Sequence, residues 1–577
     1  MRTSWHRKCV SDSTPLEPLS YRRDALPQKE HSTESVCHIC RSSSVLYGNT
    51  LSSRQHKSQV HGTPWTGLQS VCVCFRYTLM ASGSVSRLAA LPRTEILIYW
   101  ILSFGSHFYS FYQLHRFSKE HKAGLERDLQ LEPGLLPGLR RDPADFEWSF
   151  WTEWGRKSLL WSLTGHALLS ISTGLFIPKL RVPVLLVYGL LAAGGVLGLK
   201  GVCVLLLHLG LSFTVAQLRR PALCWACSLL SLSTLHIPSL LKIQRAWYDT
   251  EEEYYLLLFS VAVCGLRIIS FSLEHCWRPL EAVGVVQLFW LLSYSFYHPL
   301  FYNGPIITFK DYTQQMRRSA GESFSVDGVL RYLVLRTGRI VLWWLTAEYM
   351  IHAMYMHAIQ ANESYLESLP PWALGGLALA LVQFFYVKYL VLFGLPSMLA
   401  TLDRLSPPAL PRCVSTMHSF TGMWRHFDEG LYRWLIRYIY VPLGGSRYGP
   451  AYKALATGLA FGFVCLWHGG HDYLQYWALM NWAGVLVETA VKALFATSVV
   501  ESFIERTLSA AMKRRGVALL SGGSTAMLIL SNLLFLGGTH VGRLFWKRVF
   551  VQGWSTIAPP MLAFLYCFAQ VGLERAP

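Results

Sequence analysis

The stretch VLLVYGLLAAGGVLGLKGVCVLLLHLGLSFTVA, residues 184–216, decides the fold class. Its one charged side chain is Lys200, and nearly every other residue is apolar or small. A helix needs about 20 apolar residues to cross a hydrocarbon layer of roughly 30 Å, and this stretch is longer than that. The interruption at Lys200 therefore predicts two membrane helices joined by a short turn.

Similar apolar runs recur along the chain. Of its 577 residues, 52% are hydrophobic and only 15% are charged, a balance that a water-soluble globule does not normally show. The other runs lie at residues 96–112, 159–177, 221–240, 254–273, 282–301, 329–358, 372–395, 473–495, 522–537 and 555–571. Backbone groups in hydrocarbon must be satisfied within the protein, and these runs are longer than barrel strands. We predict an all-α polytopic membrane protein with roughly ten to twelve membrane helices.

Residues 1–90 have a different character. They are rich in serine, and they lack both a periodic apolar segment and a hydrophobic signal core near Met1. They carry 11 lysines and arginines against 5 acidic residues, so most of the formal net charge of +18 belongs to the rest of the chain. We predict a disordered extension over 1–90 and a membrane domain over 91–577. A basic surplus on a membrane protein favours contact with anionic lipid headgroups, and no nucleic-acid motif is present.

The segment at 411–473 is too polar for a simple spanning helix and too aromatic for a solvated loop. Re-entrant or interfacial helices around a cavity would reconcile these two properties. Its arginines could hold phosphates through forked donors, or they could contact lipid headgroups. Phe146, Phe150 and Trp154 also share one helical face, which is typical of a helix in the bilayer interface or of one packed on neighbouring protein.

His468 lies in FVCLWHGGHDY, residues 463–473, at the end of an apolar run. An ionisable group at membrane depth is costly, which favours a functional role over that of a buried core histidine. The following glycines would allow a substrate to approach the backbone closely. An imidazole can accept a proton from a nucleophile, and the carboxylate of Asp428 could orient a cationic amine or a histidine. His471 and Asp472 are interpreted as boundary residues.

Asp428 precedes His468 by forty positions, and this arrangement in a polytopic chain resembles the membrane-bound O-acyltransferase superfamily. More closely, the chain resembles the branch that acylates Hedgehog proteins. The resemblance runs from about Leu91 to the C-terminus. Its motifs are HFYSFY (107–112), DFEWSFW (145–151), NGPI (303–306), MYMHAI (354–359), FYVKYLVLFG (385–394), PPALPRCVSTM (407–417), SFTGMWR (419–425), WHGG (467–470) and SNLLFLGG (531–538).

The resemblance implies transfer of palmitate from palmitoyl-CoA to the amino-terminal cysteine of a Hedgehog protein in the endoplasmic reticulum membrane, or in the Golgi. His468 would be the general base and Asp428 the orienting carboxylate. Trp424 and Arg425 would line the CoA end of a central tunnel, with Trp467 and Asn532 as further substrate-binding residues. Apolar helices would sheath the acyl chain, with membrane lipids around them. A related branch that resembles the acyltransferases lacks the histidine, whereas this chain retains His468.

The resemblance also implies haem b held by a cysteine thiolate, which falls on Cys413. From the residues alone, Cys413 could equally be a core residue or a palmitoylation site. The extension at 1–90 lies outside the resemblance, so it could be non-native and come from alternative initiation or a gene-model error. Two other functions remain open: an O-acyltransferase of the same superfamily that acts on a lipid or a serine, and a non-catalytic membrane scaffold or transporter.

Overall fold

The computed structural model describes residues 89–577 except 130, 136–137, 278–283, 320–325 and 576–577. The extension that the sequence predicts to be disordered therefore lies outside the described residues, apart from Ala89 and Ala90. The described residues belong to one compact unit, Val85–Pro577.

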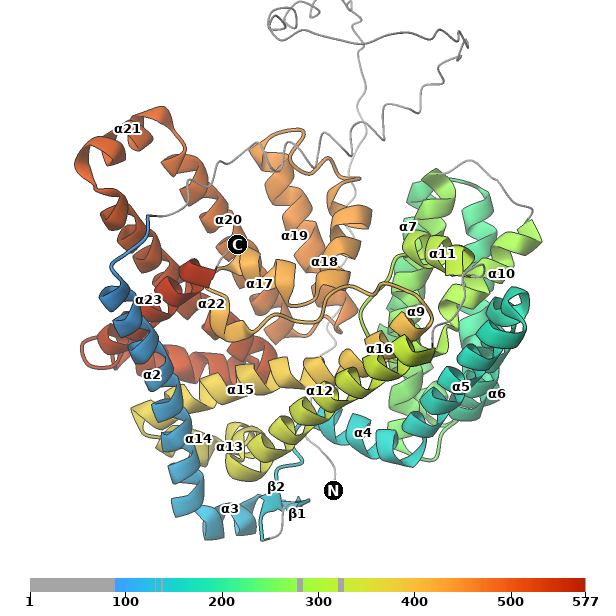
Figure 1. The fold of residues 1–577 in the computed structure, drawn as a ribbon, viewed down its shortest axis with the longest axis horizontal. Helices are drawn as coiled ribbons and strands as arrows, with labels where there is room; N and C mark the ends of the chain where they lie inside the picture. The colour runs from blue at the N-terminus through green and yellow to red at the C-terminus, as the bar shows by residue number, and fades with distance from the viewer. Residues whose placement is uncertain (1–88, 130, 136–137, 278–283, 320–325, 576–577) are drawn as a thin grey trace, which may run out of the picture. The chain divides into compact units, whose positions relative to one another are not determined.

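Helices dominate this part of the chain (Figure 1). The first are α2 (Arg93–Glu120), α3 (Lys122–Asp128), α4 (Phe146–Trp154), α5 (Leu160–Phe176), α6 (Arg181–Gln217), α7 (Pro221–Ser233), α8 (Pro238–Arg245), α9 (Glu251–Trp277), α10 (Gly284–Ser295), α11 (Phe309–Ser319) and α12 (Val326–Ala353). Among the described residues, the only strands are β1 (Glu132–Pro133) and β2 (Arg140–Arg141), which pair antiparallel.

The second half of the chain continues the helical pattern. It contains α13 (Met356–Ala361), α14 (Glu363–Ser368), α15 (Pro371–Leu392), α16 (Gly394–Leu402), α17 (Phe420–His426), α18 (Glu429–Leu435), α19 (Pro450–Trp467), α20 (Asp472–Phe495), α21 (Ser498–Thr507), α22 (Ala510–Trp546) and α23 (Ala558–Arg575). The all-α prediction is confirmed.

The break that the sequence predicts near Lys200 is present, two residues earlier. Helix α6 is interrupted at Gly198, whose φ of 66° and ψ of 174° are not helical. Glycine reaches this conformation at little cost because it has no Cβ. Helix α22 contains a similar interruption at Gly538.

Seven helical segments among the described residues are long and apolar enough to cross a membrane, or eight if one bent pair counts as a span. This number is lower than the predicted ten to twelve. Most of the predicted run at 329–358 lies in α12, which carries Arg331, Arg336 and Arg339. The described part of the run at 282–301 contains the short helix α10 and a 3₁₀ turn over His298–Leu300. Two of the seven segments contain the glycine breaks described above, so each consists of two helical pieces.

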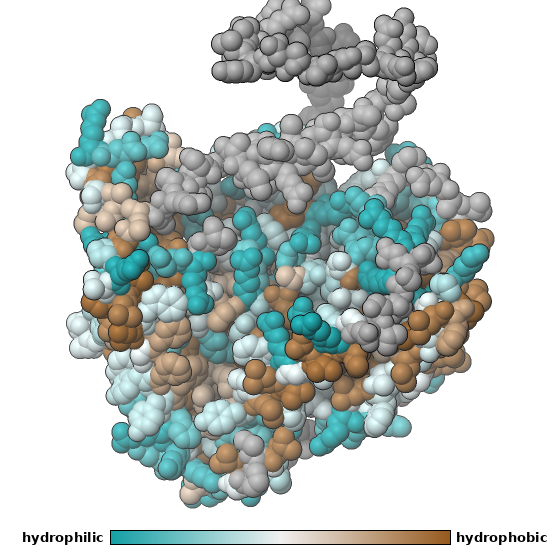
Figure 2. Space-filling view, in the orientation of Figure 1, coloured by the Kyte–Doolittle hydropathy of each residue, from teal (hydrophilic) through white to brown (hydrophobic). Residues whose placement is uncertain are grey.

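Two large apolar cores and two smaller clusters hold the described helices together. Of the two large cores, one is built on α15, which packs against α2 and α12 and crosses the middle of Figure 1, and it extends to α22. The other is built on α9, which packs against α6 and α7. In the apolar part of α9, 78% of the residues are buried, against 22% for the segment that contains α6. Large apolar side chains are exposed on α5 and α6, where Figure 2 shows hydrophobic surface, as expected of helices that face lipid.

The aromatic face of helix α4 contacts neighbouring parts of the protein, as the second of its two interpretations predicts. The rings of Phe146 and Phe150 stack with centroids 5.9 Å apart, and Phe150 stacks on Trp154 at 6.1 Å. This face packs on protein, because Tyr255 meets Phe146 edge-on and Tyr302 meets Trp154 in the same way.

The region at 411–473 contains no long helix before α19. Helices α17 and α18 have seven residues each, and a helical turn over Ile436–Tyr440 follows them. The sequence predicts re-entrant or interfacial helices in this region, and their position relative to a membrane stays a prediction. Helices α17 and α18 carry Trp424, Arg425 and the residues next to Asp428.

Candidate active site

His468 stands at the point where α19 ends. Its N–H donates to Val464 O at 3.0 Å, and the next two N–H groups donate to Leu466 O and Cys465 O. Gly469 and Gly470 have φ of 112° and 67°, which reverses the chain toward α20. The two glycines therefore serve the turn itself.

The His468 ring opens onto accessible space although protein packs closely around it. Its side chain is exposed, yet Trp467 lies edge-on with centroids 4.7 Å away and Phe535 lies at 5.4 Å. The protein packed against the ring keeps water from those sides, and this desolvation lowers the pKa of His468, which lies beyond the last residue of α19, to about 4. Within the described part of the chain, neither ring nitrogen has a hydrogen-bond partner. The imidazole is therefore neutral at pH 7 and has a free lone pair for a proton.

Trp424 reaches the same region from α17. Its indole N–H donates to Asn481 Oδ1 at 3.0 Å, and its ring meets Trp477 edge-on at 5.2 Å. Trp477 lies 5.2 Å from Phe535, the ring that also contacts His468. Phe535 thus joins the surroundings of Trp424 to those of His468.

Asn532 lies three residues before Phe535 on α22, and this spacing places both on one helical face. It is half-buried, and its Nδ2 donates to Leu528 O at 3.0 Å, which leaves the second N–H of the amide for another acceptor. Trp467 donates its indole N–H to Ala262 O on α9 at 3.0 Å, which anchors the end of α19. Arg425 is exposed.

Asp428 caps helix α18. Its Oδ1 accepts the N–H of Leu431 at 2.9 Å. Burial raises the pKa of Asp428 to about 6, against the opposing effect of two backbone N–H groups. No hydrogen bond or ion pair joins Asp428 to His468 among the described residues. They are linked through rings: Phe427 stacks on Phe385 at 5.1 Å, and Phe385 meets Phe535 at 5.9 Å.

The sequence interpretation missed two polar residues of α20, Asn481 and Glu488. Asn481 binds Trp424, and Glu488 accepts hydrogen bonds from the start of α17. Glu488 lies inside the apolar run at 473–495, so the cost of a carboxylate at membrane depth was the signal that could have found it.

Cys413 offers an exposed thiol just before the turn over Val414–Thr416. An exposed cysteine sulfur is a side chain that could hold a haem iron. Among the described residues, no three His, Cys, Asp or Glu side chains group as they would around a metal ion.

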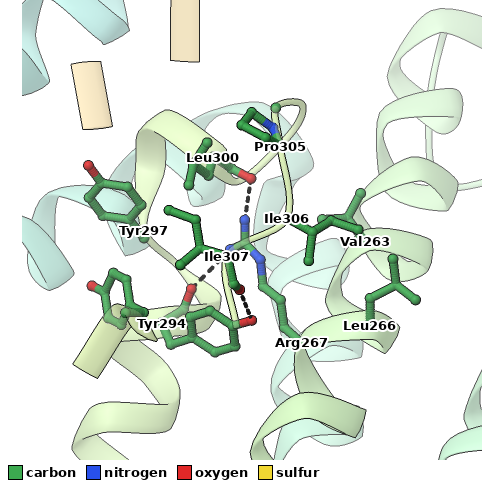
Figure 3. A pocket seen from close by; sticks show the side chains of 11 residues that line it. Val263, Leu266, Arg267, Tyr294, Tyr297, Leu300, Pro305, Ile306 and Ile307 are labelled. Atoms are coloured by element: carbon green, nitrogen blue, oxygen red, sulfur yellow. Dashed lines mark hydrogen bonds between the residues drawn. The ribbon is translucent and has the colours of Figure 1, made fainter. Parts of the chain in front are cut away.

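A small cavity of about 20 Å³ lies away from these residues, between α9 and the loop at 300–307 (Figure 3). Arg267 points into this region and donates to Tyr294 O at 3.0 Å, to Ser295 O at 2.7 Å and to Leu300 O. The guanidinium thus satisfies carbonyls at the end of α10 and in the loop. None of the residues predicted for the active site lines this cavity.

Comparison with known proteins gives a family match over the region that holds these residues. Residues 213–531 match the model described as MBOAT, membrane-bound O-acyltransferase family. His468, Asp428, Trp424 and Cys413 all fall inside the matched range.

Individual relatives extend the similarity. The chain is 48% identical over 494 residues to the mouse protein-cysteine N-palmitoyltransferase HHAT. This match covers 84% of the chain and 99% of the mouse protein. It is 29% identical over 491 residues to the mouse HHAT-like protein, covering 84% of this chain and 95% of that one. The Drosophila melanogaster protein-cysteine N-palmitoyltransferase Rasp is 29% identical over 65% of this chain and 76% of its own length.

Proposed function

The chain belongs to the membrane-bound O-acyltransferase family, and from that premise we propose that it is a protein-cysteine N-palmitoyltransferase that moves palmitate from palmitoyl-CoA to the amino-terminal cysteine of a Hedgehog protein. The observation that carries the proposal is the 48% identity to mouse HHAT over 99% of that enzyme. This coverage includes the membrane helices as well as the region of His468.

His468 is the general base in this proposal. A thioester is an activated acyl donor, and an α-amine has a pKa of about 7.7–8.0, so a share of the amine is already the neutral nucleophile at pH 7. The neutral amine nitrogen attacks the thioester carbonyl, and His468 accepts the proton that the nitrogen loses as the carbon–nitrogen bond forms. This proton passes to the sulfur as the carbon–sulfur bond breaks, so CoA leaves as its thiol. The neutral and accessible imidazole of His468 supports this role.

Asp428 orients the incoming amine. With a pKa of about 6, its carboxylate is mostly ionised at pH 7 and can accept a hydrogen bond from an ammonium group. The absence of a direct contact with His468, among the described residues, favours the amine over the imidazole as its partner. The second amide N–H of Asn532 could stabilise the tetrahedral oxyanion. The ring of Trp424, whose single N–H is bound to Asn481, would line the acyl-CoA site, and Arg425 could bind the CoA phosphates.

The acyl chain would lie in a tunnel between apolar helices, where each buried methylene contributes about 0.8 kcal/mol and tunnel depth selects the chain length. Such a tunnel would admit acyl-CoA from one side of the membrane and the protein substrate from the other. The chain is a multi-pass membrane protein, and we place it in the endoplasmic reticulum membrane or the Golgi, with its catalytic domain over residues 91–577.

Haem b is a separate part of the proposal. Cys413 would hold the haem iron through its sulfur. Acyl transfer changes no oxidation state, so a bound haem would act as a structural ligand. The purified protein should show a Soret band that is lost in Cys413→Ala while the protein remains folded.

Palmitoyl transfer to a synthetic peptide that begins with cysteine tests the function directly. We expect the purified protein to palmitoylate this peptide, and N-terminal acetylation of the peptide should abolish transfer because the amine is blocked. Transfer to a serine or to a lipid, with none to the cysteine peptide, would assign the alternative O-acyltransferase activity.

The same assay tests the site. Folded His468→Ala protein should lose at least about a hundredfold in kcat, as expected for removal of a general base. Wild-type activity in this variant would overturn the role of His468 and leave the assignment of the substrate intact.

A further inference from the structure

One face of α20 carries four residues at helical spacing: Trp477, Asn481, Gly484 and Glu488. Steps of four, three and four positions keep the side chains on the same side of a helix. Helix α17 packs against this face, and the two helices lie close together in Figure 1. Each of the four residues makes a different contact with α17.

Asn481 fixes the side chain of Trp424. It is fully buried, and its Oδ1 accepts the indole N–H of Trp424 at 3.0 Å. Its Nδ2 donates to Trp477 O at 2.7 Å, and this second bond sets which side of the amide faces Trp424. The ring of Trp477 closes the other side of the Trp424 indole.

Glu488 fixes the start of the same helix. Its carboxylate accepts the N–H of Phe420 at 2.6 Å, the N–H of Thr421 at 3.1 Å and the Thr421 hydroxyl at 2.8 Å. The hydroxyl of Ser524 on α22 donates to it at 3.0 Å. Together with the Ser419 cap on Gly422 N, these bonds satisfy N–H groups that a helix start leaves without partners.

Gly484 allows the close packing between these two anchors. A Cβ at this position would lie 2.6 Å from the ring of Phe420, which is closer than atoms can approach. Phe420 therefore rests directly on the backbone of α20.

A helix of seven residues is too short to hold its own conformation or direction, so its surroundings must supply both. For α17, the supporting surface is the face of α20. Through Trp477 and Phe535, this surface also connects Trp424 to the His468 ring.

We propose that Asn481 and Glu488 are positioning residues for acyl transfer, which hold α17 so that Trp424 keeps one orientation beside the ring cluster around His468. The proposal rests on the function proposed above. Neither residue touches the reacting atoms: Asn481 acts through the Trp424 indole, and Glu488 acts through the first turn of α17.

A double-mutant cycle tests Asn481. Asn481→Leu has a similar volume but no acceptor, and we expect kcat/KM for palmitoyl transfer to fall about tenfold, the effect of losing one buried hydrogen bond. Trp424→Phe lacks the indole N–H, so adding Asn481→Leu to it should lower kcat/KM less than about twofold further. Equal losses in both backgrounds would show that Asn481 does not act through Trp424, and would overturn the proposal.

Fluorine NMR gives a readout that is independent of activity. With 5-fluorotryptophan in place of the 21 tryptophans, the Trp424 resonance is the one that disappears in Trp424→Phe. We expect Asn481→Leu and Glu488→Gln to shift or broaden this resonance. The matched control is Ser524→Ala, which removes only the α22 donor of Glu488 and should leave the resonance unchanged.

An unchanged Trp424 resonance in both Asn481→Leu and Glu488→Gln would overturn the proposal even if activity falls. Failure of the wild-type protein to acylate the cysteine peptide would instead contradict the proposed function, while the resonance would still report whether α20 positions Trp424.

Discussion

At the scale of single residues, similar surroundings act on His468 and Asp428 in opposite directions. Burial disfavours the charged form of each group, so it lowers the pKa of His468 to about 4 and raises that of Asp428 to about 6. His468 is therefore neutral throughout the physiological range. Asp428 takes up a proton only about one pH unit below neutrality, which makes it the group of this pair whose charge changes near working conditions.

The pH dependence of transfer should follow Asp428 and the substrate amine. We expect kcat/KM to fall as the pH drops through about 6, because the protonated carboxyl no longer orients the ammonium group. As the pH is raised further, kcat/KM should increase again near pH 8, because the substrate amine, with a pKa of about 7.7–8.0, loses its proton there. Initial rates with a cysteine peptide between about pH 5 and 9 would measure both steps.

Asp428→Asn is the matched control for this profile. Asparagine caps helices as well as aspartate does, so the bond to Leu431 N and the unfolding temperature should be retained while the charge is lost. The step near pH 6 should then disappear and transfer should be slow at every pH. If the step persists in the variant, another group causes it.

At the scale of elements, the connection between α19 and α20 shows what local sequence predicts and what it does not. The sequence correctly placed His471 and Asp472 at a boundary, because α20 begins at Asp472, but it did not predict that α19 ends at Trp467 and that the two glycines form the turn. The docking of α17 on α20 could not be predicted in this way. Its hydrogen bonds join residues 57 and 68 positions apart, and no helical or strand periodicity extends over such a separation.

The two glycines of the turn should respond differently to substitution. Gly469 has a φ of 112°, outside the left-handed helical region, and an added Cβ would lie 3.2 Å from the His471 ring. Gly470 has a φ of 67° and open space around it. We expect Gly469→Ala to cost about 2–3 kcal/mol of unfolding free energy and to reduce transfer, and Gly470→Ala to cost about 1 kcal/mol.

Gly470→Asn is the milder control, because asparagine tolerates the left-handed conformation. Thermal unfolding in detergent, followed together with transfer rates, would rank the three variants. A larger effect at Gly470 than at Gly469 would mean that the turn differs from the one described.

At the scale of the whole molecule, buried charges join helices that lie far apart in the sequence. Lys388 on α15 is 4% exposed and pairs with Asp145 and Glu147 at the start of α4, each at 2.9 Å. A lysine inside an apolar run signals from sequence that a partner must exist. The identity of that partner could not be predicted, because Asp145 lies 243 positions earlier.

Removing the lysine should therefore cost far more than removing an exposed one. Lys388→Met leaves the partly buried carboxylates of Asp145 and Glu147 without the lysine that pairs with both, and we expect the free energy of unfolding to fall by about 3–5 kcal/mol. Lys157→Met breaks an ion pair of similar length, 2.7 Å to Glu153, in which the lysine side chain is 69% exposed, and it should change stability by less than about 0.5 kcal/mol. Adding Asp145→Asn and Glu147→Gln to Lys388→Met should recover much of the lost stability, because the two carboxylate charges are then removed as well. The Asp145→Asn change should keep the helix cap, because asparagine can also accept the hydrogen bond that Asp145 accepts from Trp148 N. Thermal unfolding of the detergent-solubilised proteins measures all three. Equal shifts for Lys388→Met and Lys157→Met would mean that water reaches the α4–α15 contact and that this pair does not hold the two helices together.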